Sequence, residues 1–295
     1  MIVSSPAKIL QPESSLQPID DVYALTQNYD AFIVDLWGVI HDGTHLYDGA
    51  DRLLRGIRDA GKTVILLSNA PRQAHKVQTV LDRLGLERDF YQQIVTSGQA
   101  AHDYLLNTDK HGTRYYYLGP EKDLDVLADL DYEQAPIEEA DFVLNAGFEY
   151  DYQPEEEALP LLKKLKAHNV PFICINPDIE VVKQDGRRLL CAGHAARTYR
   201  DMGGEVMYFG KPFPAIYQVC FDAINADKSR ILAVGDNLHT DIAGANTVGI
   251  ESLLITGGIL LQQLGEKPQA DDLQPLCQEM SAWPTYFAPR FTLAK

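Results

Sequence analysis

Four places in this sequence put carboxylate, hydroxyl, amide or ammonium groups just after a short apolar run. In chain order they are Asp35, the pair Ser68 and Asn69, Lys211, and Asp236 followed by Asp241. A carboxylate can attack phosphorus and form an aspartyl-phosphate. Carboxylates together with a main-chain carbonyl suit Mg²⁺, a hard cation that prefers oxygen ligands. Lysine, hydroxyl and amide groups stabilise charge on phosphate oxygens, so the combined set favours phosphoryl-transfer chemistry.

Each of these residues also has a purely structural interpretation. An aspartate at a strand end is commonly a turn residue or a helix cap, and Ser68 and Asn69 precede a helix led by Pro71. A single lysine such as Lys211 is typically a solvated surface residue. The chemical interpretation therefore requires that the four sets lie at the strand ends of one sheet.

The elements that must position these groups are buried strands alternating with helices. Continuous apolar runs predict strands at 31–34, 64–67, 94–95, 206–209, 231–234 and 253–255. Helical periodicity or helix-start and helix-stop residues predict helices at about 49–60, 71–84, 214–225 and 240–247. This alternation indicates an α/β fold with a Rossmann-like, doubly wound parallel sheet. Ligands of such sheets gather at the carboxyl ends of the strands.

A second, smaller α/β unit is predicted to be inserted at 110–190, and it is treated as a cap domain. Its strands are expected at 114–118, 142–145 and 172–175, with helices near 122–128 and 154–167. The core domain then comprises 29–109 and 191–262. Residues 1–28 are rich in Ser, Pro and Gln and predict a loose N-terminal arm, and residues 263–295 predict a C-terminal tail that packs on the core.

Composition restricts the partners and the compartment. Lys and Arg number 26 against 42 Asp and Glu, a formal net charge of −16, which disfavours nucleic acid and anionic membrane surfaces. An anionic substrate would then need local cations or a metal. No apolar run approaches the roughly 20 residues that span a membrane, and no basic, apolar leader opens the chain. The four scattered cysteines fit buried thiols in a reducing compartment, so a cytoplasmic protein is expected.

The order of the polar sets resembles the haloacid dehalogenase superfamily of aspartate-nucleophile phosphatases. Its first motif is matched by Asp35–Val39 and its second by Ser68–Asn69. The third is matched by Lys211 in Gly-Lys-Pro, and the fourth by Gly235–Asp241. An insertion between the second and third motifs resembles subclass IIA, which includes p-nitrophenylphosphatase-like and sugar- or nucleotide-phosphatases. The resemblance covers roughly residues 30 to 258.

The resemblance implies a role for each matched residue. Asp35 would be the nucleophile, and Asp35, the Trp37 carbonyl and Asp236 would bind Mg²⁺ with support from Asp241. Ser68, Asn69 and Lys211 would hold the phosphate. The segment Ile175–Asp178 looks like the cap loop that faces substrate, which makes Asn176 and Asp178 candidates for substrate contacts. The expected partner is a small phosphorylated metabolite, and a homo-oligomer formed through the cap is left open.

One departure from the family pattern concerns the acid/base. Phosphatases of this family usually carry a second aspartate two residues after the nucleophile, and here that position is Trp37. Indole is neither an acid nor a base near neutral pH, and loss of a general acid/base costs about 10²–10⁴-fold in rate. His41, Asp42, His45 or His239 could replace it, although all four are more readily interpreted as polar loop residues.

Three functional hypotheses follow from the motifs and from this departure. The first is a Mg²⁺-dependent hydrolase of small phosphate monoesters that acts through an aspartyl-phosphate, with low activity. The second is a catalytically impaired relative that binds a phosphorylated metabolite. The third is transfer of the phosphoryl group to an acceptor other than water.

Overall fold

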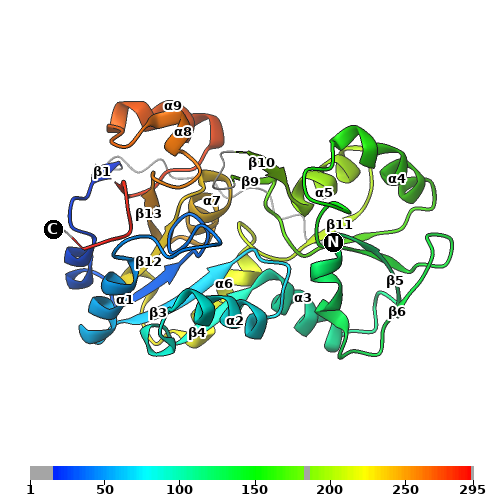
Figure 1. Cartoon of the computed structure of the whole chain (residues 1–295), viewed down its shortest axis with the longest axis horizontal. Helices are drawn as coiled ribbons and strands as arrows, with labels where there is room; N and C mark the ends of the chain where they lie inside the picture. Colours follow the sequence, from blue (N-terminus) through cyan, green and yellow to red (C-terminus); the bar gives the residue numbers. More distant parts are fainter. Residues whose placement is uncertain (1–15, 183–186, 294–295) are drawn as a thin grey trace. The chain divides into compact units, whose positions relative to one another are not determined.

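The computed structural model describes residues 16–182 and 187–293, which form two compact units (Figure 1). The first unit consists of the described residues up to Ser68, Thr79–Ile94, and the described residues from Pro212 onward. The second consists of Asn69–Gln78 and Val95–Lys211. The insertion predicted at 110–190 therefore lies within the second unit, which also takes in segments on either side of it.

A seven-stranded sheet organises the first unit. Its order is β1-β14-β13-β12-β2-β3-β4, and the strand pairs from β1 through β3 are parallel. The strands are β1 Gln17–Pro18, β2 Ala31–Val34, β3 Thr63–Ser68, β4 Gln93–Thr96, β12 Ile231–Gly235, β13 Glu251–Ile255 and β14 Tyr286–Ala288. The predicted α/β fold with a Rossmann-like parallel sheet is confirmed.

The central strands of this sheet are buried on both faces, as their unbroken apolar runs predict. All four residues of β2 and all five of β12 are buried. The helices that accompany the sheet are α1 Ala50–Asp59, α2 Ala74–Leu84, α6 Pro214–Ala223, α7 Ala243–Val248, α8 Leu261–Leu264 and α9 Ala270–Met280. Shorter helical segments lie at η1 Val22–Gln27, η2 Arg88–Phe90, η4 Lys228–Arg230 and η5 Leu238–Ile242.

Two terminal segments belong to the first unit in different ways. From Leu16 onward the predicted loose arm is wrong, because β1 pairs with β14 and the η1 residues Val22 and Leu25 are buried. The part of that prediction that covers residues 1–15 lies outside the described residues. The C-terminal segment supplies β14 to the sheet, and Leu273, Cys277 and Phe287 are buried in one apolar cluster.

The second unit has a five-stranded sheet of its own, in the order β11-β8-β7-β5-β6. These strands are β5 Arg114–Leu118, β6 Glu133–Gln134, β7 Phe142–Asn145, β8 Phe172–Cys174 and β11 Val206–Tyr208, and a separate antiparallel pair joins β9 Glu180–Val182 to β10 Arg188–Leu190. The helical segments are α3 Ser97–Leu106, η3 Glu121–Leu127, α4 Glu155–Ala167 and α5 Ala192–Asp201. α3 and α5 are absent from the sequence-based prediction.

The strand before Lys211 corrects the prediction that one sheet carries all four polar sets. β11 pairs with β8, with Val206 opposite Phe172, and so belongs to the five-stranded sheet. Its three residues are only half-buried, whereas those of β2 and β12 are buried. A short apolar run predicts a strand but carries no information about which sheet the strand joins.

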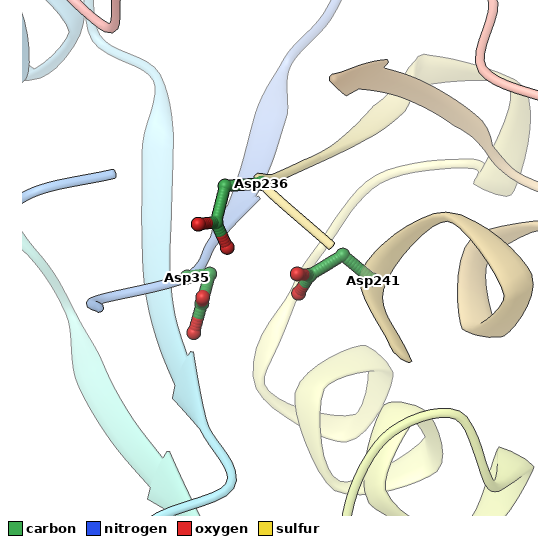
Figure 2. A group of neighbouring side chains, drawn as sticks. All are labelled: Asp35, Asp236 and Asp241. Atoms are coloured by element: carbon green, nitrogen blue, oxygen red, sulfur yellow. The ribbon is translucent and has the colours of Figure 1, made fainter. Parts of the chain in front are cut away.

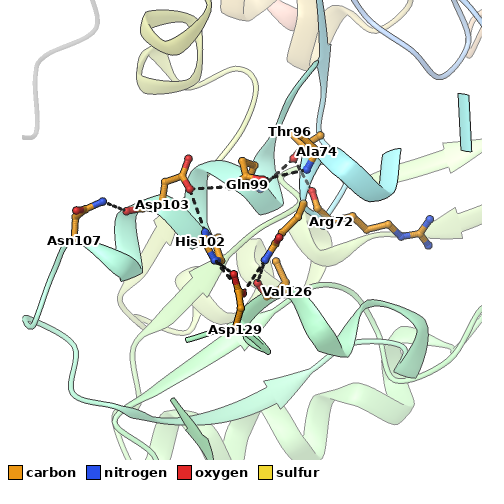
Figure 3. Close-up of polar contacts among 10 residues, drawn as sticks. Arg72, Ala74, Thr96, Gln99, His102, Asp103, Asn107, Val126 and Asp129 are labelled. Carbon is orange, nitrogen blue, oxygen red and sulfur yellow. Dashed lines mark hydrogen bonds and ion pairs between the residues drawn. The ribbon is translucent and has the colours of Figure 1, made fainter. Parts of the chain in front are cut away.

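A polar junction in the second unit ties helix α3 to the segment after η3 (Figure 3). His102 lies between the carboxylates of Asp103 and Asp129, with each ring nitrogen 3.1 Å from a carboxylate oxygen. Gln73 Nε2 donates to the Val126 carbonyl at 2.9 Å and to Asp129 Oδ1 at 3.1 Å. We call these contacts the Asp129 junction.

Candidate functional site

Three buried aspartates of the first unit form a compact cluster, which we call the carboxylate cluster (Figure 2). One oxygen from each of Asp35, Asp236 and Asp241 lies within 4.8 Å of the others. Asp35 follows β2 and Asp236 follows β12. These strands are parallel neighbours with Val34 opposite Val234, so both carboxylates emerge at the same edge of the sheet.

The carboxylate cluster fits a hard divalent cation. The side chains are buried, and like charges this close raise the free energy of the ionised state unless a cation compensates them. Carboxylate oxygens are the ligands that Mg²⁺ and Ca²⁺ prefer. The donor set in this unit therefore agrees with the metal site expected at Asp35 and Asp236.

Glycines leave the space that the carboxylates occupy. A Cβ atom at Gly38 would lie 2.0 Å from Asp236 Oδ2, and one at Gly258 would lie 2.1 Å from the same oxygen. At Gly235 it would lie 2.0 Å from Asp241 Cγ. Gly38 also has φ +80°, a conformation that favours glycine. Gly38 and Gly235 lie within two of the matched motifs, but nothing in the sequence indicated their steric role, and Gly258 lies outside every motif.

Main-chain donors orient two of the three carboxylates. The Ile259 N–H donates to Asp236 Oδ2 at 2.8 Å, and the Asn237 N–H donates to Asp241 Oδ2 at 3.2 Å. Asp241 itself lies in η5, a single π-helical turn that leads into α7. The prediction of a regular helix over 240–247 misses this wider turn, a feature that is frequent at functional sites.

Ser68 lies at the same edge of the first unit's sheet as the carboxylates. It is the last residue of β3, the neighbour of β2, and it is buried. Of the four predicted polar sets, the structure thus brings the first, the hydroxyl of the second and the fourth to adjacent strand ends of one sheet.

Trp37 packs within the loop that follows Asp35. The Ile40 and His41 N–H groups donate to the Leu36 carbonyl at 2.9 and 3.1 Å, which closes a tight turn. The Trp37 ring meets the His41 ring edge-on with centroids 5.8 Å apart. A Cβ atom at Gly43 would lie 2.5 Å from Trp37 Cη2. The indole therefore occupies space beside its own loop.

His41 is held in its neutral form, which weighs against it as a proton donor. Its Nδ1 accepts a hydrogen bond from the Gly43 N–H at 2.9 Å, so any ring proton resides on Nε2. Burial lowers the pKa of His41 to about 4, partly opposed by the nearby Asp42 carboxylate. His239, another predicted substitute, is exposed in η5.

The second unit brings Asn69, Asp178 and Lys211 together with Ser97, a residue that sequence reasoning missed. We call these four residues the amide cluster. Asn69 Nδ2 donates to Asp178 Oδ1 at 2.8 Å and to the Lys211 carbonyl at 3.0 Å. Asn69 Oδ1 accepts from the Lys211 N–H at 2.7 Å and from Ser97 Oγ at 3.2 Å.

The predicted cap loop supplies the Asp178 of this cluster. Asn176 Oδ1 accepts from the Asp178 N–H at 3.2 Å, so the two predicted substrate-contact residues are themselves linked. Asn69 and Lys211 are both buried, while Asn176 and Asp178 are half-buried. Within the second unit, four of the predicted site residues therefore belong to one continuous hydrogen-bonded group.

The parallel sheet and the acidic strand ends are those of an α/β enzyme with a Rossmann-like core. Residues 32–133 match the model of the haloacid dehalogenase-like hydrolases, and residues 208–289 match a second model, described as HAD-hydrolase-like. A haloacid dehalogenase-like hydrolase from Brucella suis 1330 has a similar crystal structure, with 32% identity and a TM-score of 0.79. The match covers 92% of this chain and 98% of that one. The chain belongs to the haloacid dehalogenase-like hydrolase family.

Two further relatives are phosphatases. The acid sugar phosphatase of Staphylococcus haemolyticus (strain JCSC1435) is 26% identical over 248 residues, which cover 82% of this chain and 91% of the relative. The 4-nitrophenylphosphatase of Thermotoga maritima has the same fold, with a TM-score of 0.69 at 22% identity over 91% of this chain and 97% of that one. The predicted family and the prediction of a hydrolase are confirmed. Among the described residues, every helix is too short or too polar to cross a membrane.

Proposed function

We propose that the protein is a Mg²⁺-dependent phosphatase of small phosphate monoesters, acting through an aspartyl-phosphate on Asp35. The observation that carries the proposal is the carboxylate cluster, in which the candidate nucleophile lies beside two further buried carboxylates. Family membership and two phosphatase relatives support the same reaction class.

Each residue of the cluster has a distinct part in this proposal. Asp35 attacks phosphorus, the ester oxygen leaves as the alcohol or alkoxide, and water then releases the phosphate from Asp35. Asp35, the Trp37 carbonyl and Asp236 would hold the cation. Asp241, whose carboxylate lies beside those of Asp35 and Asp236, would support this site. When bound, a divalent cation offsets the negative charge that otherwise keeps a phosphate away from these carboxylates.

Ser68 and Lys211 are assigned to bind the phosphate oxygens. Asn69 is linked to this pair by its hydrogen bonds with the main chain of Lys211. A hydroxyl and an ammonium stabilise the charge spread over these oxygens. The assignment follows the motifs of the family, which Ser68–Asn69 and Lys211 match. The loop residues Asn176 and Asp178 are assigned to contacts with the rest of the substrate, a small phosphorylated metabolite.

The loop at Trp37 favours a second candidate, a relative that binds phosphate esters and turns over slowly. The indole fills space next to His41, and that histidine is neutral, so neither residue supplies a proton at pH 7. A burst of Asp35 phosphorylation without steady turnover would identify this candidate. A reducing, cytoplasmic setting fits both candidates, since all four cysteines are buried thiols.

The test is a screen for phosphate release over sugar phosphates, nucleotides and aryl phosphates, with and without Mg²⁺. We expect Mg²⁺-dependent release from at least one class, abolished in the Asp35→Asn variant. Release that persists in a folded Asp35→Asn variant would rule out the aspartyl-phosphate route. Acid-stable trapping of phosphorylated parent without release would support the second candidate.

A further inference from the structure

We propose that the Asn69 side chain is a positioning residue that fixes Lys211 and Asp178 in one arrangement, rather than a ligand of phosphate. This inference rests on the proposed function, in which Lys211 binds the phosphate. The interactions that carry it lie entirely within the second unit.

The amide of Asn69 is fully used inside the protein. A primary amide offers two N–H donors and an oxygen with two lone pairs. Both N–H groups of the amide donate hydrogen bonds, one to Asp178 Oδ1 and one to the Lys211 carbonyl. The oxygen accepts from the Lys211 N–H and from Ser97 Oγ. An amide with four internal partners has no hydrogen-bonding capacity left for a phosphate oxygen.

The pairing with Lys211 holds the main chain of that residue at two points. The Lys211 N–H donates to Asn69 Oδ1 and its carbonyl accepts from Asn69 Nδ2, so one side chain spans both main-chain groups. Asn69 is 4% exposed and Lys211 is 3% exposed, and hydrogen bonds in such surroundings are costly to leave unmade. The direction in which the Lys211 side chain departs is thereby set by Asn69.

Gly210 allows this close approach. Its φ is +121°, and a Cβ atom there would lie 2.2 Å from Ser97 Oγ and 2.5 Å from Asn69 Oδ1. The same atom would lie 2.8 Å from Pro177 Cδ. The glycine of the Gly-Lys-Pro motif is therefore required so that Asn69, Ser97 and the cap loop can meet around one point.

The loop that carries Asp178 is anchored on its other side by helix α5. The Gly193 N–H donates to the Asp178 carbonyl at 3.0 Å, and a Cβ atom at Gly193 would lie 2.1 Å from the Pro177 carbonyl oxygen. With its main chain held by α5, Asp178 receives its side-chain orientation from Asn69. Phosphate affinity through Lys211 and selectivity through Asp178 should consequently change together when Asn69 changes.

The test is the isosteric substitution Asn69→Asp. The two acceptor contacts remain, while the donor amide becomes a carboxylate oxygen that faces the Lys211 carbonyl and the Asp178 carboxylate. We expect the affinity for inorganic phosphate, measured by calorimetry with Mg²⁺ present, to fall by about tenfold or more. KM for an aryl phosphate should rise by a similar factor, with a smaller change in kcat.

Reversing the pair provides the rescue. In the double variant Asn69→Asp with Asp178→Asn, the new amide can donate to the new carboxylate, so the cross-loop hydrogen bond returns. We expect at least about a threefold recovery of phosphate affinity over Asn69→Asp alone. A double variant that is no better than the single one would overturn the pairing of Asn69 with Asp178.

Gln73→Glu is the matched control. Gln73 also donates from one amide nitrogen to a main-chain carbonyl and an aspartate, at the Asp129 junction of the same unit. We expect unchanged phosphate affinity there, and an equal loss in both variants would reduce Asn69 to a general stability role. If Asn69→Asp does not fold, Ser97→Ala replaces it, with an expected two- to threefold loss of affinity, and no loss would count against the proposal.

Phosphate binding separates this inference from the proposed function. A parent that binds phosphate but hydrolyses no ester would refute the phosphatase and leave the role of Asn69 measurable. A parent that hydrolyses esters, with an Asn69→Asp variant of unchanged phosphate affinity and KM, would refute the positioning role alone.

Discussion

The carboxylate cluster and the amide cluster use polar side chains in opposite ways. In the first unit, three buried groups of the same charge lie within 4.8 Å, oriented by main-chain donors and given space by glycines. In the second unit, the Asn69 amide is satisfied by its own neighbours. The first arrangement gathers oxygen ligands that a cation could bind, whereas the hydrogen bonds of the second hold its own residues in place.

The difference distinguishes residues that hold a ligand from residues that hold each other. Both clusters contain residues that family motifs assign to the reaction, and residue type does not separate their roles. The four hydrogen bonds of the Asn69 amide and the close approach of the three carboxylates do. This contrast predicts that variants in the carboxylate cluster change the chemistry and the metal requirement, while variants in the amide cluster change affinity.

The largest effect is expected for Asp35→Asn. An amide of the same size is neither a nucleophile nor an anionic metal ligand, so hydrolysis should fall by on the order of 10⁴-fold or more. Because the variant removes one charge from a like-charged group, its Tm without Mg²⁺ should equal or exceed that of the parent. Phosphate-release assays and thermal melts check both statements, and a marked drop in Tm would show that Asp35 is structural.

Asp236→Asn should raise the Mg²⁺ concentration for half-maximal activity by about 10²-fold. The amide fits between Gly38 and Gly258, where Asp236 lies now, but carries no charge. Asp30→Asn is the control, because Asp30 pairs with Arg230 and Lys62 outside the cluster. Equal half-saturation in Asp236→Asn and parent would mean that Asp236 acts only as a turn residue.

Trp37→Asp should raise the hydrolysis of alkyl phosphates relative to aryl phosphates by about tenfold. A general acid helps most when the leaving oxygen is strongly basic, and the parent has indole at this position. Trp37→Phe keeps an aromatic ring beside Gly43 and His41 and should leave the ratio unchanged. If the parent already cleaves both classes equally, another group donates the proton and the interpretation of Trp37 is wrong.

The smallest effect is expected for the pH dependence of stability, through the titration of His41. Its pKa is near 4 in the folded chain and near 6.5 when unfolded, so below pH 6.5 the unfolded state binds the proton first. The neutral histidine therefore contributes stability above pH 6.5 that is lost progressively as the pH falls toward 4. His41→Asn retains an acceptor for the Gly43 N–H without titrating, and should reduce the loss between pH 7 and 5.5 by about 1 kcal/mol. Urea unfolding at both pH values measures this loss of unfolding free energy. An equal loss in parent and variant would contradict its assignment to His41.

The sequence was sufficient for the central strands of the first unit because they are continuous apolar runs and acidic residues follow two neighbouring strands. β2 and β12, with Asp35 and Asp236 at their ends, appear in the structure where their patterns predict strands. The family resemblance also identified Asp241 as a site residue. The π-helical turn that contains Asp241 was not predicted, because a single turn gives no periodic pattern.

The second unit was harder to predict because its contacts join residues far apart in the chain. Asn69 and Asp178 are separated by 109 positions, and nothing in either local sequence indicates that they meet. Ser97 follows an apolar run, as a residue at a helix start commonly does, and it is indeed the first residue of α3. The sheet to which β11 belongs is likewise decided by its pairing with β8, which the run Val206–Phe209 does not encode.

The pairing of β2 with β12 has a consequence for the order in which the protein folds. β2 begins at Ala31 and its partner β12 at Ile231, so 200 residues of synthesis separate them. At about 5–20 residues per second, β2, the strand that Asp35 follows, is complete on the order of 10–40 s before this neighbour is made. The last residue of the amide cluster, Lys211, is made before β12 begins. On the ribosome, the amide cluster can therefore form while the carboxylate cluster is still incomplete, and one edge of an apolar strand must be kept from aggregation until Asp236 and Asp241 arrive.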